Sequence, residues 1–321
     1  MKKFSSLIIA SLMSVSIWAT EGALLGRFTI NANGDQVVFS QGNLQASYNG
    51  SEWKWFFAKH QWDYIDDKSG NISIDDEGKI PANDTVDLFG WSTPATYYGI
   101  NNSVENSTYA GKFEDWGNNI GEGWRTLSRG EWMYLFHERD KADELFGLGT
   151  INGIKGTIIL PDDWTLPDGA IFNKAKDKNL VWYSEGYYRN SNHDNFSHNT
   201  YTVEQWSTME KAGAVFLPAA RNRVGKGVYG GGDGDYWSST SYDAANARYV
   251  YFVQDYFGPQ NYDYRYYGQS VRLVQAAPEG PEAIDEITND QSSITNKIIK
   301  DNQLLIQRGD KTFNAIGTQV K

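Results

Sequence analysis

The sequence predicts a β-rich α+β fold with two short helices and a small C-terminal β-hairpin tail. Three observations predict it. The 321 residues include 32 glycines and are 15% aromatic and 21% charged, a composition typical of a loop-rich globular chain. Short apolar or alternating segments are separated by turn residues, which favours strands. Two segments begin with the residue spacing of a helix capping box.

The N-terminal part of the chain predicts strands. Segment Arg27–Leu44, "RFTINANGDQVVFSQGNL", predicts two short strands around the turn Asn33-Gly34. Segment Glu52–Tyr64, "EWKWFFAKHQWDY", alternates aromatic and polar residues, so we expect a strand there as well.

The first helix is predicted by "WRTLSRGEWMYLF". Ser128 has the position of an N-cap, and Glu131 has the position from which a side chain reaches back to the N-cap. Trp132, Leu135 and Phe136 follow at i, i+3 and i+4, so they share one helix face. We expect that face to be buried.

The second helix is predicted by "TVEQWSTMEKAG", with Thr202 and Gln205 as the capping pair and Gly213 as the stop. Two strands flank it in sequence. "GIKGTIILPDDW" predicts a strand broken by Pro161, and "GAVFLPAA" predicts a buried strand. In "QSVRLV", Val271 and Leu273 alternate as inward-facing strand residues. Core packing is the default for the tryptophans beside these signals, which are Trp116, Trp124, Trp132, Trp164 and Trp237.

The two ends of the chain differ from its centre. Residues 1–19 combine Lys2 and Lys3 with an apolar run, and Ile17 and Ala19 have the −3 and −1 positions of a cleavage site, which predicts a secretory signal peptide. Residues 23–275 form the predicted globular domain. Residues 276–293 carry two prolines, acidic residues and no aromatic, and are interpreted as a linker. Residues 294–321 predict a two-strand unit that turns at Arg308–Lys311.

Charge and cysteine content exclude several classes of function. The formal net charge of −11 argues against a nucleic-acid partner, because phosphate binding needs clustered Lys and Arg. The chain has no cysteine, so disulfides, cysteine-based zinc sites and thiol nucleophiles are excluded. No segment after the first 19 residues is long and apolar enough to predict a membrane span.

The short motifs in the sequence predict no cofactor and no metal. Arg308-Gly309-Asp310 matches an adhesion tripeptide but also a hairpin turn, which we prefer. The acidic run Asp75–Glu77 lacks EF-hand spacing, although an opportunistic calcium ion stays open. His193 and His198 lie in a loop-like stretch that would not fix a metal pair. No nucleophile elbow, Walker or dinucleotide motif is present.

One window departs from the rest of the chain. Gly227–Pro278 contains no Lys and no Glu, although the chain has 18 Lys and 15 Glu, and Tyr229–Tyr267 holds 10 of the 20 tyrosines. Tyrosine offers large contact area at a low cost in side-chain entropy, as in antibody loops. In "RYVYFV", Val250 and Phe252 alternate with Tyr249 and Tyr251. We therefore expect the first pair in the core, beside Trp237, and the two tyrosines on a contact face; simple coverage of a β surface by tyrosine is the alternative.

These residues carry a family resemblance. "WRTLSRGEWMYLF" resembles the W-R-L-P-T-x-x-E-W signature of C-type-lectin-like domains of the formylglycine-generating-enzyme type. "FLPAARNR", "GDYWSSTSY" and "GQSVRLV" are similar to the closing half of that fold in bacterial surface proteins. More specifically, residues 219–274 resemble the variable region of target proteins of diversity-generating retroelements. The enzymes of this fold need cysteines, so the resemblance implies the scaffold without the catalysis.

The resemblance also implies which residues contact a ligand. In this family, template adenines are randomised on copying, and AAC codons for Asn become Tyr, Asp, Ala, Gly, Ser, Val, Phe or Arg, but not Lys or Glu. Asn246 and Asn261 would then be unmutated or reverted positions. The implied ligand-contact residues are Tyr229, Asp233, Asp235, Asp243, Ala244, Ala245, Asn246, Tyr249, Tyr251, Asp255, Tyr256, Tyr262, Asp263, Tyr264 and Tyr266.

Together these observations predict an exported, non-catalytic C-type-lectin-like binding protein, secreted or held at the cell surface or outer membrane. Its partner would be a protein or glycan on another cell, phage or host surface. The tail is similar to short C-terminal modules of exported proteins of Gram-negative anaerobes, some of which are sorting signals. Two alternatives stay open: a structural pilus or surface-layer subunit, and a hydrolase that uses paired carboxylates.

Overall fold

The structure is a computed structural model of the whole chain. It describes residues 22–73, 80–91, 113–190 and 194–278, and the backbone of four short strands between residues 295 and 320. The predicted signal peptide, the acidic run Asp75–Glu77, His193, most of the predicted linker and the Gly309-Asp310 turn lie outside the described residues.

The chain divides into two compact units, Met1–Ala277 and Pro278–Lys321. The smaller unit is an antiparallel sheet of four strands in sequence order: β19 (Thr295–Lys300), β20 (Gln303–Arg308), β21 (Lys311–Asn314) and β22 (Gln319–Val320). The predicted pairing across Arg308 and Lys311 is present. The prediction of a two-strand hairpin was wrong, because β19 and β22 add one strand on each side of that pair.

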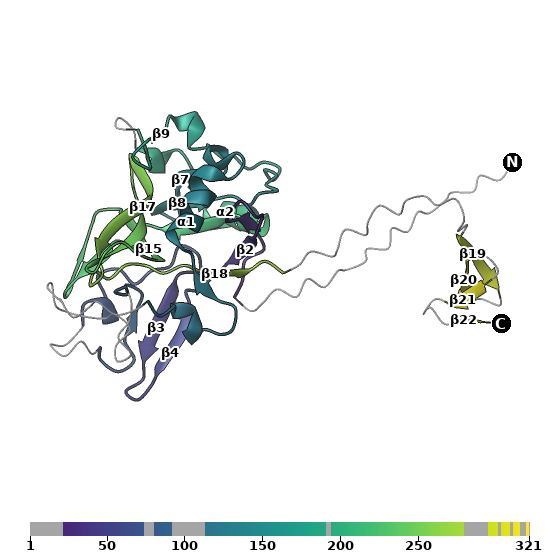
Figure 1. Cartoon of the computed structure of the whole chain (residues 1–321), viewed down its shortest axis with the longest axis horizontal. Coiled ribbons are helices and arrows are strands. Elements are labelled where there is room, and N and C mark those ends of the chain that lie inside the picture. Colours follow the sequence, from purple (N-terminus) through teal and green to yellow (C-terminus); the bar gives the residue numbers. More distant parts are fainter. Residues whose placement is uncertain are drawn as a thin grey trace. The chain divides into compact units, whose positions relative to one another are not determined.

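The larger unit is β-rich, with two α-helices and mainly antiparallel sheets. One sheet joins the two ends of this unit, since β2 (Gln36–Phe39) pairs with β18 (Leu273–Ala276), as Figure 1 shows. Its outer strands are β1 (Phe28–Thr29) and β6 (Arg125–Thr126). The β1–β2 hairpin turns at the predicted Asn33-Gly34, where Gly34 has φ +85°.

A five-stranded sheet, drawn in green at the left of the larger unit in Figure 1, carries most of the predicted contact residues. Its order is β15 (Gly234–Ser241), β16 (Asn246–Val253), β17 (Tyr256–Tyr264), β10 (Tyr187–Arg189) and β9 (Val181–Tyr183). A third sheet contains β11 (Thr200–Tyr201), β7 (Phe146–Ile151), β8 (Ile154–Ile159) and β12 (Val215–Pro218). Smaller sheets contain β4 (Trp53–Phe57), β3 (Leu44–Tyr48) and β5 (Thr85–Val86), and the pair β13 (Asn222–Val224) and β14 (Gly227–Tyr229).

Both predicted helices are confirmed, with their capping boxes. They are α1 (Arg129–Met133), which continues as a π-helical turn over Tyr134–Glu138, and α2 (Val203–Lys211). The predicted strand before Pro161 ends at Ile159, as β8. The strand predicted over Glu52–Tyr64 was too long: β4 ends at Phe57, and the remainder is turn and loop.

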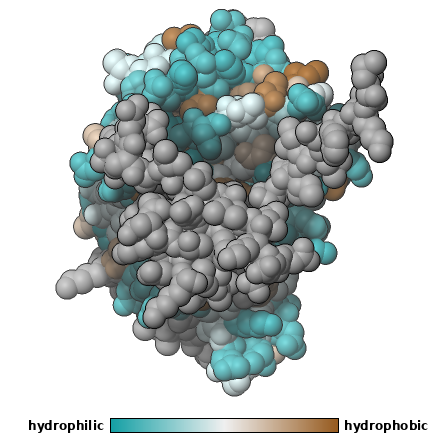
Figure 2. Space-filling view, turned by 90° about the vertical axis from the view of Figure 1, so that its right-hand side faces the viewer, coloured by the Kyte–Doolittle hydropathy of each residue, from teal (hydrophilic) through white to brown (hydrophobic). Residues whose placement is uncertain are grey.

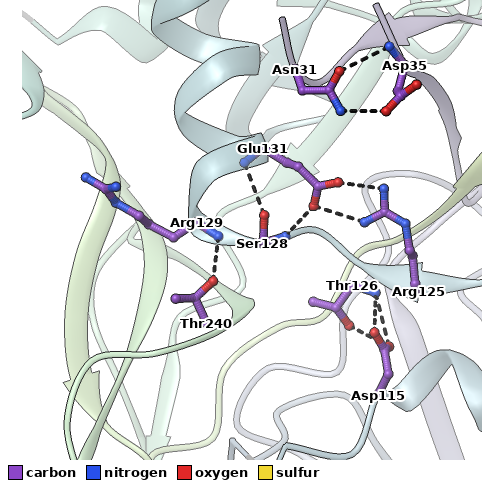
Figure 3. Close-up of polar contacts among 9 residues, drawn as sticks. All are labelled: Asn31, Asp35, Asp115, Arg125, Thr126, Ser128, Arg129, Glu131 and Thr240. Atoms are coloured by element: carbon purple, nitrogen blue, oxygen red, sulfur yellow. Dashed lines mark hydrogen bonds and ion pairs between the residues drawn. The ribbon is translucent and has the colours of Figure 1, made fainter. Parts of the chain in front are cut away.

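The start of α1 is fixed by a compact polar cluster (Figure 3). The Ser128 hydroxyl accepts from the backbone N–H of Glu131 (3.2 Å), and the Glu131 carboxylate accepts from the backbone N–H of Ser128 (2.7 Å). The same carboxylate accepts two hydrogen bonds from the Arg125 guanidinium, at 2.9 and 2.6 Å. The backbone N–H of Arg129 donates to the hydroxyl of Thr240 (2.9 Å), which ties the helix to β15.

We expect Glu131→Ala to lower the free energy of unfolding by about 1–2 kcal/mol, because it removes both the capping bond and the bidentate ion pair with Arg125. Urea unfolding followed by circular dichroism measures the change. Glu138→Ala, at an exposed position of the same helical segment, is the matched control, with an expected change within about 0.5 kcal/mol. Equal losses in the two variants would contradict the structural role of the cluster.

Two hydrophobic clusters pack on opposite faces of β15 and β16. The first contains Trp132, Phe136, Val250 and Phe252, all 0% exposed. The second gathers side chains from three other parts of the chain around Trp237; its aromatic members include Trp91, Trp116, Trp124 and Tyr249. Because adjacent residues of a strand point to opposite faces, the central strands lie between two cores.

The predicted core residues are mainly confirmed. Of the five tryptophans assigned to the core, four are at most 6% exposed: Trp116, Trp124, Trp132 and Trp237. Trp164 is only partly buried, against a third cluster built around Trp206. Val271 and Leu273 are fully buried, as is Arg272 between them. The Arg272 guanidinium donates to Asn43 Oδ1 (3.2 Å) and Gln61 Oε1 (3.0 Å), so the "GQSVRLV" segment anchors the domain from inside.

Candidate ligand-binding surface

Most of the predicted contact residues lie on three adjacent strands, β15, β16 and β17, or in the turns that join them. Asp235 is on β15, and Asp243, Ala244 and Ala245 form the turn that leads into β16. Further members lie on β16 (Asn246, Tyr249, Tyr251) and β17 (Tyr256, Tyr262, Asp263, Tyr264), and the remaining ones are on β14 or in loops (Tyr229, Asp233, Asp255, Tyr266). The sheet therefore brings most of this set together.

Tyrosine dominates the exposed part of this region. Tyr229, Tyr262 and Tyr264 are exposed by 58%, 54% and 47%. Tyr242, which the sequence analysis did not select, is exposed by 46% in the same turn as Asp243. Tyr242 lies inside the Tyr-rich window, and this position is the signal that would have placed it among the predicted contact residues.

Two members of the predicted set are buried. Tyr249 is 9% exposed and Asp235 is 1% exposed, so the prediction that Tyr249 points to a contact face was wrong. The alternation along β16 does place Tyr249 and Val250 on opposite faces of the sheet. The face that carries Tyr249 is nevertheless buried, because the second hydrophobic cluster covers it. Trp237 packs edge-on against Tyr249 with 6.0 Å between ring centroids. Tyr251, two residues further along β16, is half-buried.

A row of aromatic rings crosses all five strands on the face that carries Tyr249. The rings are in contact in the order Tyr183, Tyr187, Tyr256, Tyr251, Tyr249 and Trp237, with centroid separations of 5.2, 4.9, 5.7, 6.0 and 6.0 Å. Exposure rises along the row, from 0% at Trp237 to 44% at Tyr183 on the edge strand β9. Tyr183 and Tyr187 were missed because they lie outside the Tyr-rich window and join this face only through the β10–β17 pairing.

Carboxyl groups lie beside the buried end of this row. Burial, followed by the charges of Asp233 and Asp263, raises the pKa of Asp235 well above its usual value. Burial also raises the pKa of Asp263 to about 6 and increases that of Asp233. Neither carboxyl oxygen of Asp235 has a hydrogen-bond partner. These carboxyl groups therefore keep their protons to a higher pH than free aspartic acid does.

The β15–β16 turn is held by its own side chains. The Asp243 carboxylate accepts from the backbone N–H of Ala245 (2.8 Å) and of Asn246 (2.7 Å), and from the Asn246 amide (3.0 Å). These bonds lower the pKa of Asp243, with the Asn246 side chain the largest cause. Asp243 and Asn246 thus fix the turn, and Ala244 and Ala245 stand exposed at its tip.

Arg248 lies beside this turn, against two tyrosines. Its guanidinium carbon is 4.3 Å from the ring centre of Tyr242 and 5.8 Å from that of Tyr262. The two rings stack on each other with centroids 4.2 Å apart. This arrangement is a cation–π cluster at the exposed end of the sheet.

No family model, no curated protein and no solved structure matches this chain. Three clefts among the described residues, of about 580, 390 and 470 Å³, include none of the predicted contact residues. Enclosed pockets are typical of sites for small molecules, whereas the exposed tyrosines lie on open strands and turns.

Two further properties of the described residues bear on the site. They contain no cluster of three His, Cys, Asp or Glu side chains arranged to hold a metal ion. None of the helices in this part of the chain combines the length and apolar character that a bilayer crossing requires. On the side of the molecule seen in Figure 2, the visible described surface is mainly hydrophilic, with hydrophobic residues in small groups.

Proposed function

We propose that this protein is an exported, non-catalytic binding protein with a C-type-lectin-like fold, of the variable type that diversity-generating retroelements modify. Its ligand is a protein or glycan on another cell, phage or host surface. The contact surface consists of the exposed tyrosines Tyr229, Tyr242, Tyr262 and Tyr264, together with the β15–β16 turn; we call it the tyrosine surface.

One observation carries the proposal. Five tyrosines of the described residues are exposed by more than a third, and four of them belong to the tyrosine surface; the fifth is Tyr183. Three of these four tyrosines lie on β17 or in the β15–β16 turn, in a sheet that is anchored by fully buried residues such as Trp237, Val250 and Phe252. Rigid aromatic side chains on a fixed framework lose little entropy on binding, which favours recognition of a partner over coverage of the sheet alone.

The motif behind the family resemblance supports a scaffold role. Arg125, Ser128 and Glu131 are all used to cap and hold α1. Sequencing the DNA around the gene tests family membership separately. We expect a near-copy of the region that encodes residues 219–274, differing at adenines, beside a reverse transcriptase gene; its absence would remove the retroelement part of the proposal.

Replacing the four residues of the tyrosine surface by serine should abolish binding of the purified protein to its target surface and leave its melting temperature within about 3 °C, because exposed positions contribute little to stability. Flow cytometry against bacterial, phage-coated and host-cell surfaces measures the binding. Ile171→Ser, at an apolar position that is 72% exposed and lies outside the surface, is the matched control. Unchanged binding by the fourfold variant would refute the assignment.

A further inference from the structure

Arg129 and Arg248 form a pair of guanidinium groups without a carboxylate partner among the described residues. Arg129 is the first residue of α1, and Arg248 is on β16. Both bind the same residue: a terminal N–H of Arg129 donates to the side-chain oxygen of Gln260, and Arg248 Nη1 donates to the Gln260 backbone oxygen (2.7 Å). Neither arginine forms an ion pair with any described residue, whereas Arg125, Arg139 and Arg221 each do.

The electrostatics of this pair are unfavourable without a further group. Burial, and then the charge of Arg129, lowers the pKa of Arg248. Arg129 Nε is buried and has no hydrogen-bond acceptor. Two neighbouring positive charges repel each other, and a chain of net charge −11 has carboxylates in excess that could have neutralised them. An anionic group bound here would relieve that repulsion and would form charge-assisted hydrogen bonds with the guanidinium groups.

The residues around the two arginines indicate which kind of molecule bears the anionic group. Tyr242 and Tyr262, which contact Arg248, expose 46% and 54% of their surface. Flat, exposed tyrosine rings beside hydrogen-bond donors suit a sugar ring, with an apolar face against the aromatic and a polar edge toward the guanidinium. The net charge of −11 repels densely charged polyanions. It therefore favours a ligand with isolated charges.

We infer that the Arg129–Arg248 pair, with Tyr242 and Tyr262, binds an acidic sugar, that is, a single carboxylate or sulfate group on a glycan. The inference rests on the proposed function, because it assigns ligand chemistry to one part of the tyrosine surface. A guanidinium can bind either anion through two parallel hydrogen bonds. Carboxylated and sulfated sugars are therefore the two sources that an experiment has to separate.

The test is titration of the full chain with defined oligosaccharides by isothermal calorimetry. The probes are 3′-sialyllactose, which carries one carboxylate, 3′-sulfolactose, which carries one sulfate, and lactose, the neutral counterpart of both. We expect one acidic probe to bind at least about tenfold more tightly than its neutral counterpart. That binding should weaken as the NaCl concentration rises. The acidic probe that binds identifies the source of the anion.

Arg248→Gln and Arg129→Gln should each weaken binding of that acidic probe about tenfold or more, and Arg248→Lys should restore only part of it, because lysine keeps the charge without the planar fork. Arg189→Gln is the matched control: Arg189 is an exposed arginine of the same sheet, and its loss changes the net charge equally. Circular dichroism and the melting temperature report whether each variant folds.

Two results would overturn the inference: equal binding of acidic and neutral probes, or no binding of any probe. Neither of them would refute the proposed function, which is judged by loss of cell-surface binding in the fourfold tyrosine variant. Conversely, Arg248→Gln could lose acidic-sugar binding while the fourfold tyrosine variant keeps its cell-surface binding. That result would support the acidic-sugar site and refute the proposal that the tyrosine surface binds the target cell.

Discussion

Replacing Tyr249 by alanine should lower the free energy of unfolding by about 3 kcal/mol, a cost typical of removing a buried aromatic ring. Tyr249 is 9% exposed and packs between Trp237 and Tyr251 in the second hydrophobic cluster. Truncation leaves a cavity that the neighbouring rings cannot fill without leaving their own contacts. In a domain of this size the melting temperature should fall by roughly 6–12 °C.

The comparison that gives this result its meaning is Tyr262→Ala on the adjacent strand. Tyr262 is 54% exposed and its ring contacts Tyr242 and Arg248, so we expect a loss below about 1 kcal/mol. Urea unfolding of both variants measures the difference. If Tyr249→Ala were as stable as Tyr262→Ala, Tyr249 would not be a core residue and would return to the list of contact residues.

Local signals were sufficient to predict the helices and much of the core. Ser128 with Glu131, and Thr202 with Gln205, each form the capping box that their spacing indicates. Such pairs depend on residues only three apart, so the sequence itself contains the whole interaction. The burial of Trp132 follows from the same local periodicity.

The side of the sheet that is buried could not be predicted in this way. Alternation along β16 separates Tyr249 from Val250, but it does not say whether one face or both will be covered. Trp116 and Trp124, which belong to the cluster that covers Tyr249, are more than a hundred residues earlier in the chain. The same limit applies to Tyr183 and Tyr187, which join the aromatic row through strand pairing with β17.

The register of the β16–β17 pairing is a second reason why the exposed tyrosines could not be predicted from the sequence. The β16–β17 pairing runs from Tyr249 opposite Asn261 to Tyr251 opposite Gly258, so β17 contains one extra residue between these pairs. A bulge of this kind changes the twist and re-aims the side chains beyond it. The exposed positions Tyr262 and Tyr264 lie on the far side of that bulge. A strict count of odd and even positions along β17 is therefore a poor guide to which tyrosines reach solvent.

Asp235→Asn should make the protein more stable than the unsubstituted chain at pH 7, with the difference shrinking toward zero near pH 4. Asp235 is 1% exposed, and neither of its carboxyl oxygens has a partner. Burial, with Asp233 and Asp263 nearby, raises its pKa in the folded state. The amide keeps the shape of the neutral carboxyl group and has no charged form.

The sign follows from the two protonation equilibria. Below the unfolded-state pKa of about 4, Asp235 is protonated in both states and contributes no difference. As the pH rises above 4, the unfolded chain loses this proton at a lower pH than the folded chain does. Ionisation therefore stabilises the unfolded state more than the folded state, and the free energy of unfolding falls. Asp263 and Asp87, whose pKa values burial raises to about 6, act in the same direction between pH 4 and 6.

The measurement is urea unfolding of Asp235→Asn and of the unsubstituted chain at intervals from pH 4 to pH 7. Taking the difference at each pH cancels the titration of every group that does not interact with Asp235; the difference that is left contains Asp235 and its coupling to Asp233 and Asp263. Asp255→Asn, in the turn between β16 and β17, controls for the loss of one negative charge. A difference that stays constant with pH would mean that Asp235 titrates alike in both states, and so that water or a cation reaches its carboxyl group beneath the tyrosine row.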